Sequence, residues 1–207
     1  MSPMDRLRLF QGEADLGGML EVSDESMLMD GMGMINDPDS FRAVYSGYMD
    51  SLPSENAIVA EARGSIVGQG LVWWRDVAEG QRIYSYSTSV LPEFLDDRAG
   101  LMDWAEARLI RTASQHPPGI EKVLETQAVQ GTRLESMVRA RGYAPARRFV
   151  EMVRSLDDIP VVPAPGGISI MPAAEETICE AWAVAGGPLR TTGVTARRTG
   201  RRRGFRK

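Results

Sequence analysis

The N-terminal part of the chain shows the apolar pattern of one strand followed by two helices. Residues 6–10 alternate polar and apolar side chains, as a strand with one buried face does. After Glu13 the apolar positions recur at helical spacing, and Asp37 and Pro38 are typical of a helix N-cap and of the first helical position. The apolar stripes predicted for the two helices are Leu16, Met19 and Leu20, and then Phe41, Val44, Tyr45 and Tyr48.

A methionine-rich segment that glycines interrupt, residues 27–34, separates these two helices. Methionine side chains are flexible and adapt to irregular surfaces, so the segment could be a substrate-facing loop. Core filling around a flexible bend is the favoured interpretation, with the substrate-facing loop as the alternative.

Three strands follow as a meander. Residues 56–62 and 65–74 are separated by Arg63-Gly64, a signal for a tight hairpin, and residues 81–90 form the third strand. Because side chains of a strand alternate between two faces, one face of this third strand is predicted to carry Tyr84, Tyr86, Thr88 and Val90.

The next stretch alternates helix and strand. A helix is predicted from the apolar face made by Leu101, Trp104, Ala105 and Leu109. A strand at 121–128, a short helix at 132–141 that ends at Gly142, and a last strand at 149–156 follow. The predicted order is β-α-α-β-β-β-α-β-α-β, a mixed α/β sheet.

Beyond residue 156 the pattern changes character. Residues 157–167 form a proline-rich linker without a helix or strand signal. Residues 168–185 repeat the opening of the chain in outline, a strand followed by a helix with acidic residues at its start, which is a weak internal repeat. Residues 186–207 have no apolar period at all.

Charge is divided unevenly between the body of the chain and this last segment. All 28 acidic residues precede Gly186 and 8 of the 24 basic ones follow it, so the net charge of −4 splits into −12 before Gly186 and +8 after it. An acidic body does not attract nucleic acid, so nucleic-acid binding is expected only through the basic tail. A functional arm of this kind is one interpretation of residues 186–207. A frame-shifted translation of GC-rich DNA is the favoured one.

The single cysteine and single histidine limit the disulfides, metal sites and catalytic triads that the chain could form. A single cysteine, Cys179, excludes an internal disulfide and suits a cytoplasmic protein. With one histidine, His116, the chain lacks the residues for a zinc site or a histidine-dependent triad, so no metal is expected. His116 precedes Pro117-Pro118-Gly119 and is expected to be a solvated loop residue.

No apolar run approaches the roughly 20 residues that span a bilayer, and no signal peptide is visible, so no membrane association is expected.

Three motifs within this order of elements resemble the GCN5-related N-acetyltransferase (GNAT) superfamily. Val90-Leu91-Pro92-Glu93 ends a central strand, Trp104-Ala105-Glu106 lies on the helix that follows, and Arg141-Gly142-Tyr143 comes after the short helix. The resemblance places a GNAT-like domain at residues 1–156. The linker and restarted strand resemble the tandem, mycothiol synthase-like members, with the second copy truncated or frame-shifted near residue 186.

This resemblance implies a fold and an activity. The fold would be a mixed, mostly antiparallel sheet of about six strands with about four helices. The activity would be transfer of acetyl from acetyl-CoA to the amine of a small molecule. The residues implied for the coenzyme are Thr88, Ser89 and Val90 along the strand, and Arg98 and Gly100 at the start of the helix.

The sequence departs from the family pattern at two functional positions. Between Phe94 and Gly100 the phosphate-binding glycines are missing, Leu95 replaces the usual Arg or Gln, and Asp96 and Asp97 stand where phosphates normally lie. The position that often carries a general-acid tyrosine is Val138. We therefore expect weak or absent acetyl-CoA binding, and the alternative function is a non-catalytic scaffold that binds a partner.

No catalytic residue is assigned from the sequence. The central strands offer Tyr84, Tyr86, Glu61 and Asp76, each of which is more typical of a structural or surface role. The helix predicted within residues 168–185 carries Trp182 without a core of its own, which raises the prospect of self-association.

Overall fold

A computed structural model describes residues 4–33, 35–48, 52–77 and 80–150, with 152, 154–155, 157, 166–167, 174 and 177–178 beyond them. The chain divides into two units, Met1–Ala144 and Pro145–Lys207. The helices and strands defined below all lie in the first unit. The predicted linker, second repeat and basic tail fall almost wholly outside the described residues and stay predictions.

The first unit is built on a five-stranded sheet whose strands follow one another in sequence order. Its strands are β1 (Arg6–Leu9), β2 (Ala57–Ala62), β3 (Ser65–Asp76), β4 (Gln81–Val90) and β5 (Glu121–Glu125). The pairs from β1 to β4 are antiparallel, and β5 joins β4 in parallel. The prediction of a mixed, mostly antiparallel sheet is confirmed.

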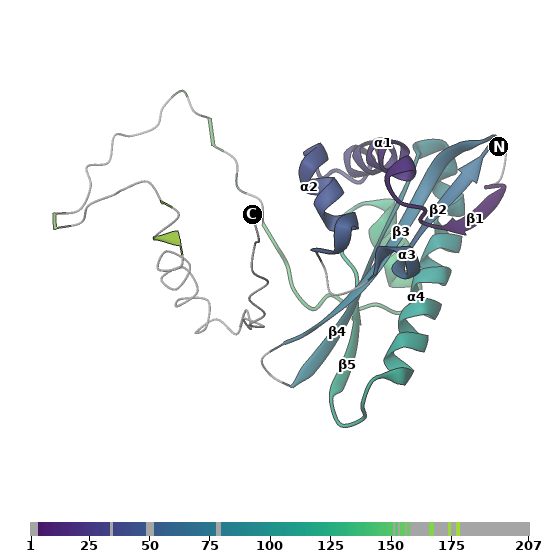
Figure 1. The fold of residues 1–207 in the computed structure, drawn as a ribbon. Coiled ribbons are helices and arrows are strands. Elements are labelled where there is room, and N and C mark those ends of the chain that lie inside the picture. Colours follow the sequence, from purple (N-terminus) through teal and green to yellow (C-terminus); the bar gives the residue numbers. More distant parts are fainter. Residues whose placement is uncertain are drawn as a thin grey trace, which may run out of the picture. The chain divides into compact units, whose positions relative to one another are not determined.

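Helices cover both faces of this sheet (Figure 1). Around α1 (Glu13–Met29) on one face lie α2 (Pro38–Ala43) and the π-helical turn η1 (Val44–Tyr48). On the other face lies α4 (Arg98–Gln115), preceded by the 3₁₀ helix η2 (Pro92–Asp97). The short α3 (Pro53–Asn56) contacts α4, since Arg108 Nε donates to Asn56 Oδ1 (3.1 Å). The last helix with defined bounds is α5 (Arg133–Ala140).

Local sequence signals explain several of these boundaries. Asp37 accepts a hydrogen bond from the backbone N–H of Ser40 (2.9 Å) and so caps α2, as predicted. Between β2 and β3, Arg63 and Gly64 have φ of 54° and 81°, the left-handed conformations that a tight hairpin requires. Thr132 caps α5 by accepting from the N–H of Glu135.

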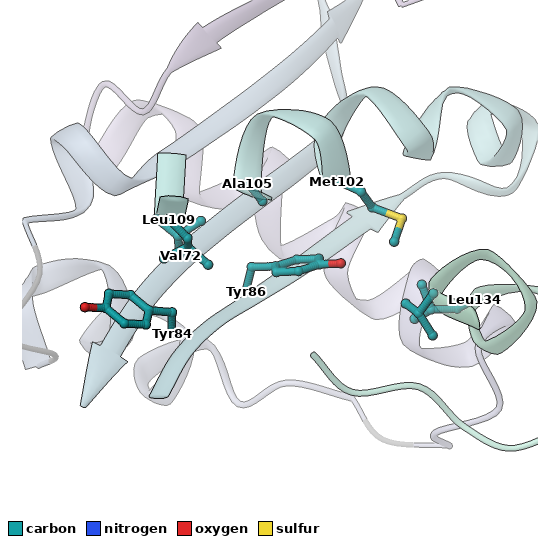
Figure 2. Close-up of a cluster of buried hydrophobic side chains, with 8 residues drawn as sticks. Val72, Tyr84, Tyr86, Met102, Ala105, Leu109 and Leu134 are labelled. Atoms are coloured by element: carbon teal, nitrogen blue, oxygen red, sulfur yellow. The ribbon is translucent and has the colours of Figure 1, made fainter. Parts of the chain in front are cut away.

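The core consists of apolar clusters on the two faces of the sheet. On the face of α1, the buried residues include Leu16, Met19, Phe41, Val59 and Leu71. On the face of α4, Tyr84 and Tyr86 pack with Met102, Ala105, Leu109 and Leu134 (Figure 2). Tyr86 extends toward Met102 and Leu134, whereas Tyr84 extends the opposite way. The predicted common face of Tyr84, Tyr86, Thr88 and Val90 is confirmed, since all four contact residues of α4: the tyrosines pack with Met102 and Leu109, Val90 with Leu101, and Thr88 accepts from Arg98.

Some predicted boundaries differ from the structure. Helix α1 runs to Met29, into the methionine-rich segment, and β5 ends at Glu125 rather than at residue 128. The strand expected at 149–156 is wrong for its described residues, which have irregular backbone; Phe149 and Val150 are 82% and 80% exposed. The apolar alternation there fits a strand, but a strand also needs a neighbour for its backbone hydrogen bonds, which a local pattern does not supply.

Candidate functional site

Strands β4 and β5 separate and leave a fork in the sheet. They pair in parallel from Gln81 and Glu121 to Ser85 and Glu125. Beyond that point β5 has ended, while β4 continues to Val90 with only β3 paired to it. The second half of β4 therefore has one edge without a neighbouring strand.

The backbone groups on this free edge can be identified from the hydrogen bonds on the other edge. The N–H of Leu91 donates to the carbonyl of Val67 on the β3 side (3.0 Å). Because successive residues of a strand point their backbone groups to opposite edges, Tyr86, Thr88 and Val90 turn theirs toward the fork.

Side chains of the protein occupy part of this edge. Thr126 Oγ1 donates to the carbonyl of Tyr86 (3.0 Å), and the N–H of Val90 donates to Ser26 Oγ (3.4 Å). Among the described residues, the N–H of Thr88 has no hydrogen-bond partner. One amide at the fork is thus left as a donor for a bound molecule.

A buried ion pair fixes the carbonyl side of the same residue. Arg98, at the start of α4, donates to both carboxylate oxygens of Asp30 (3.0 and 2.8 Å) and to Oγ1 and the carbonyl of Thr88. The side chains of Arg98 and Asp30 are 2% and 8% exposed. This pair links the end of α1, strand β4 and the start of α4.

A cavity of about 410 Å³ lies beside the fork on the face of α1. Its floor is the sheet, and Ser87 is exposed there although it lies in the middle of β4. The side walls come from α1, α2 and the segment between them, and the far wall from the residues after β5 and from α5. The lining includes Met27, Met32, Phe41, Tyr45, Gln69, Leu71, Trp73, Ser87, Ser89, Thr126 and Leu134. Met27 and Met32 line it, whereas Met29 of the same methionine-rich segment packs against a core cluster, so both core filling and a cavity-facing part occur and the substrate-facing role stays a prediction.

A glutamate stands at the branch point of the fork. Glu125 is the last residue of β5 and lines the cavity. Its Oε1 accepts from Ser85 Oγ (2.9 Å) and from Arg75 Nη2 (2.9 Å). Its Oε2 has no hydrogen-bond partner among the described residues, and the side chain is 37% exposed. Sequence reasoning missed Glu125 because the predicted strand ran past it.

Comparison with known proteins identifies the fold. No protein-family model matches the sequence, and no curated protein matches it either. Among solved structures, a GCN5-related N-acetyltransferase from Sphaerobacter thermophilus aligns with a TM-score of 0.50 and 16% identity over 68% of this chain and 44% of that one. A predicted acetyltransferase from Clostridium acetobutylicum, solved with acetyl-CoA, aligns with a TM-score of 0.52 and 13% identity over 72% of this chain and 95% of that one.

The chain has the GNAT acyltransferase fold. At these identities the likeness shows the fold and leaves the reaction to be argued from the site. This chain matches less than half of the Sphaerobacter protein.

The GNAT fold brings three of the five residues implied for the coenzyme to the cavity. Thr88, Ser89 and Arg98 line it. Val90 is fully buried and does not line it, and Gly100 is exposed on α4. Arg98 is buried and bonded to Asp30, so its guanidinium already has partners. The roles of these residues toward acetyl-CoA stay predictions.

The turn expected to hold the phosphates is largely helical, with a kink at Phe94 inside η2. η2 runs directly into α4, and the N–H of Arg98 donates to the carbonyl of Leu95. The N–H of Arg98 therefore has an intrahelical partner instead of being free for an anion. Asp96 forms an ion pair with Arg133 at the start of α5, so this carboxylate lies between the two helices.

The family position for a general acid is apolar and buried, since Val138 is 7% exposed. Nearby, Glu106 accepts hydrogen bonds from the hydroxyls of Tyr86 (3.2 Å) and Tyr143 (3.1 Å) and pairs with Arg141 (3.2 Å). Burial raises the pKa of Tyr86 to about 12, so its phenol stays protonated at neutral pH. This network joins β4, α4 and the segment after α5.

The remaining catalytic candidates lie outside the cavity lining. Glu61 pairs with Arg8 (2.7 Å) on β1, and Asp76 pairs with Arg82 (2.5 Å). Tyr84 places its hydroxyl 2.8 Å from His116 Nδ1. These contacts are structural.

His116 is therefore not the solvated loop residue that the sequence predicted. It follows α4, is half-buried, and packs against the rings of Trp74 and Tyr84 with centroids 5.4 and 5.7 Å away. Burial, together with the positive charges of Arg82 and Lys122, lowers the pKa of His116. The helix-stop prolines set the end of α4 but do not reveal that the ring folds back onto the sheet.

Two further findings concern the described part of the chain. No group of three or more His, Cys, Asp or Glu side chains there could hold a metal ion. None of its helices is long and apolar enough to cross a membrane.

Proposed function

We propose that this chain is an N-acetyltransferase domain that transfers acetyl from acetyl-CoA to the amine of a small molecule, with weak coenzyme binding. The observation that carries the proposal is the fork between β4 and β5, where the free N–H of Thr88 meets a cavity of about 410 Å³. A backbone amide held at such a place can donate to the carbonyl oxygen of a thioester and stabilise the charge that develops there.

The residues fit one part of the coenzyme and not another. An extended amide-containing arm could pair with the free edge of β4 at Thr88, as an added strand does. The diphosphate would meet the carboxylates of Asp96 and Asp97 before α4, where the N–H of Arg98 is already used. Acetyl-CoA would supply the acetyl group, and this chain's own contribution is the amide of Thr88 and the cavity for the amine.

The mismatch at the phosphates leads to a testable expectation. Neutralising the turn as Asp96→Asn/Asp97→Asn removes two negative charges while keeping side-chain size. Each charge close to a phosphate costs on the order of 1 kcal/mol after screening, so removing two is expected to tighten coenzyme A binding about thirtyfold. Isothermal titration of coenzyme A into wild type and variant measures this.

A matched control is Asp39→Asn, which removes an exposed carboxylate on α2, on the other face of the sheet. It should leave coenzyme A affinity unchanged. If the Asp96/Asp97 variant and wild type bind equally, the phosphates do not lie at this turn. Acetyl transfer to an amine panel, followed by mass spectrometry, then tests the reaction itself.

The second candidate function is a non-catalytic scaffold with the same fold. The observation that favours it is that η2 runs directly into α4 and that Asp96 there forms an ion pair with Arg133. A scaffold need not bind coenzyme A at all. Absence of binding at millimolar coenzyme A, in wild type and in the neutralised variant alike, would decide for the scaffold.

The tandem organisation and the identity of residues 186–207 remain sequence-based proposals. Resequencing of the coding DNA around codon 186 tests them, because a second reading frame that continues for a domain's length would show a frame shift.

A further inference from the structure

The polar groups that line the cavity are mostly bonded to one another. Gln69 donates to the carbonyl of Met19 and accepts from Tyr45 (3.1 and 3.2 Å), and Asn36 donates to Asp24 and to Ser23 (2.6 and 3.0 Å). A bound molecule therefore meets the apolar faces of these side chains rather than their donors and acceptors.

Few hydrogen-bonding groups remain for a ligand. Within the described residues, the lining groups without a partner include the hydroxyls of Ser87 and Ser89, the N–H of Thr88, the exposed amide of Gln127 and Oε2 of Glu125. A polyhydroxylated ligand would lose many water contacts here without replacement, which costs free energy for each unpaired group. A ligand with few polar atoms suits the cavity.

The charge of the lining points to a cation. Three carboxylates, Asp30, Asp37 and Glu125, and one guanidinium, Arg98, line the cavity. Asp30 is neutralised by Arg98, and Asp37 is exposed and caps α2, so an ion pair with it would be screened by water. Glu125 is paired with Arg75 through Oε1, but its Oε2 has no partner among the described residues, so Oε2 is the carboxylate oxygen best placed to accept from a cation inside the cavity.

Aromatic and apolar side chains make up the rest of the wall. Phe41 and Tyr45 pack with ring centroids 5.0 Å apart, and Trp73, Leu71 and Met27 line the same space. Flat apolar groups gain contact area on such surfaces, and a cation near an aromatic face is attracted by the ring.

We propose that this cavity binds a small primary amine with one positive charge and a flat apolar body, anchored by Oε2 of Glu125. This inference rests on the proposed function in assigning the ligand the place of the acetyl acceptor. It excludes polycationic and polyhydroxylated amines as preferred ligands.

Benzylamine is a suitable probe, with benzyl alcohol as its neutral counterpart and spermidine as a polycation. Isothermal titration into the full chain is expected to show benzylamine binding about tenfold more tightly than either, since one charge-assisted hydrogen bond has that effect. Glu125→Gln should weaken benzylamine binding about tenfold and leave benzyl alcohol binding unchanged.

The matched control is Glu121→Gln, on the same strand but outside the cavity lining. It should bind benzylamine as wild type does. The proposal is overturned if the alcohol binds as tightly as the amine, if spermidine binds more tightly, if Glu125→Gln has no effect, or if benzylamine does not bind. The comparison of amine with alcohol uses wild type alone, so it holds even if the Glu125 variant folds poorly.

A parallel titration with acetyl-CoA separates this inference from the proposed function. Amine binding without coenzyme binding leaves the cation site standing and removes the acetyltransferase. Coenzyme binding without amine binding removes the cation site and leaves the proposed acetyltransferase function standing.

Discussion

At the scale of single residues, a largely buried ion pair joins the first strand to the first helix. Arg8 on β1 donates to both carboxylate oxygens of Asp15 on α1 (2.8 and 2.7 Å), which also accepts from the N–H of Gln11 (2.7 Å). The two charged side chains are 12% and 5% exposed. The hydrogen bond from Arg8 lowers the pKa of Asp15, so the folded state favours the ionised form.

This pair predicts a pH-dependent contribution to stability. A carboxylate whose pKa is lowered on folding stabilises the fold above its unfolded pKa, near 4, and loses that effect as the pH falls below it. Asp15→Asn should therefore cost about 2 kcal/mol at pH 7, because Arg8 loses two charge-assisted hydrogen bonds and keeps Glu61 as its remaining charged partner. Urea denaturation at pH 7 and at pH 3 measures the change.

At pH 3 the difference between wild type and Asp15→Asn should shrink. An equal loss at both pH values would mean that the carboxylate contributes by shape alone. Asp39→Asn serves as control, since its pair with Arg42 is exposed and such pairs contribute little.

At the scale of secondary structure elements, the buried Arg98–Asp30 pair joins α1, β4 and α4 at the fork. Arg98→Met is expected to cost about 4 kcal/mol in the free energy of unfolding, because it leaves the carboxylate of Asp30 buried without its partner. The double variant Asp30→Asn/Arg98→Met removes that charge and should recover part of the loss. Thermal and urea denaturation of the two variants test this.

If the double variant Asp30→Asn/Arg98→Met were less stable than Arg98→Met, Arg98 would act through its contacts with Thr88 rather than through charge. Those contacts hold the carbonyl of Thr88, so in both variants binding at the fork is expected to weaken. Isothermal titration of coenzyme A and of benzylamine into both variants measures this loss of affinity.

Elements with strong local signals were predicted well. The bounds of β4 match the prediction at both ends, and the Arg63-Gly64 hairpin and the Asp37 cap are confirmed. These features depend on residues close together in the sequence. The early end of β5 and the irregular backbone at 149–150 depend on pairing between strands, which periodicity does not specify.

The candidate site was predicted only where it lies on one element. Thr88 and Ser89 were placed on the correct strand, at the fork. Glu125 was missed because its importance arises from the point at which two strands part, 40 residues apart in the sequence. The continuity of η2 with α4 was also not visible from the sequence, although the missing glycines pointed to a poor phosphate site.

At the scale of the whole molecule, the three apolar clusters are formed by residues of the first unit, Met1–Ala144. The sheet and all helices with defined bounds belong to the same unit. A unit that contains its own core can fold alone. Residues 1–144 should therefore form a cooperative domain without the rest of the chain.

A pair of truncations tests this expectation. Residues 1–144 are expected to unfold in one transition within about 5 °C of the full chain, because the truncation removes no residue of the three clusters. Residues 1–131 lack α5 and with it the buried Leu134 and Val138. Burying two such side chains contributes about 4 kcal/mol, so this shorter chain should be clearly less stable. Circular dichroism melts compare them, and an unfolded 1–144 chain would show that the first unit depends on contacts from residues beyond 144.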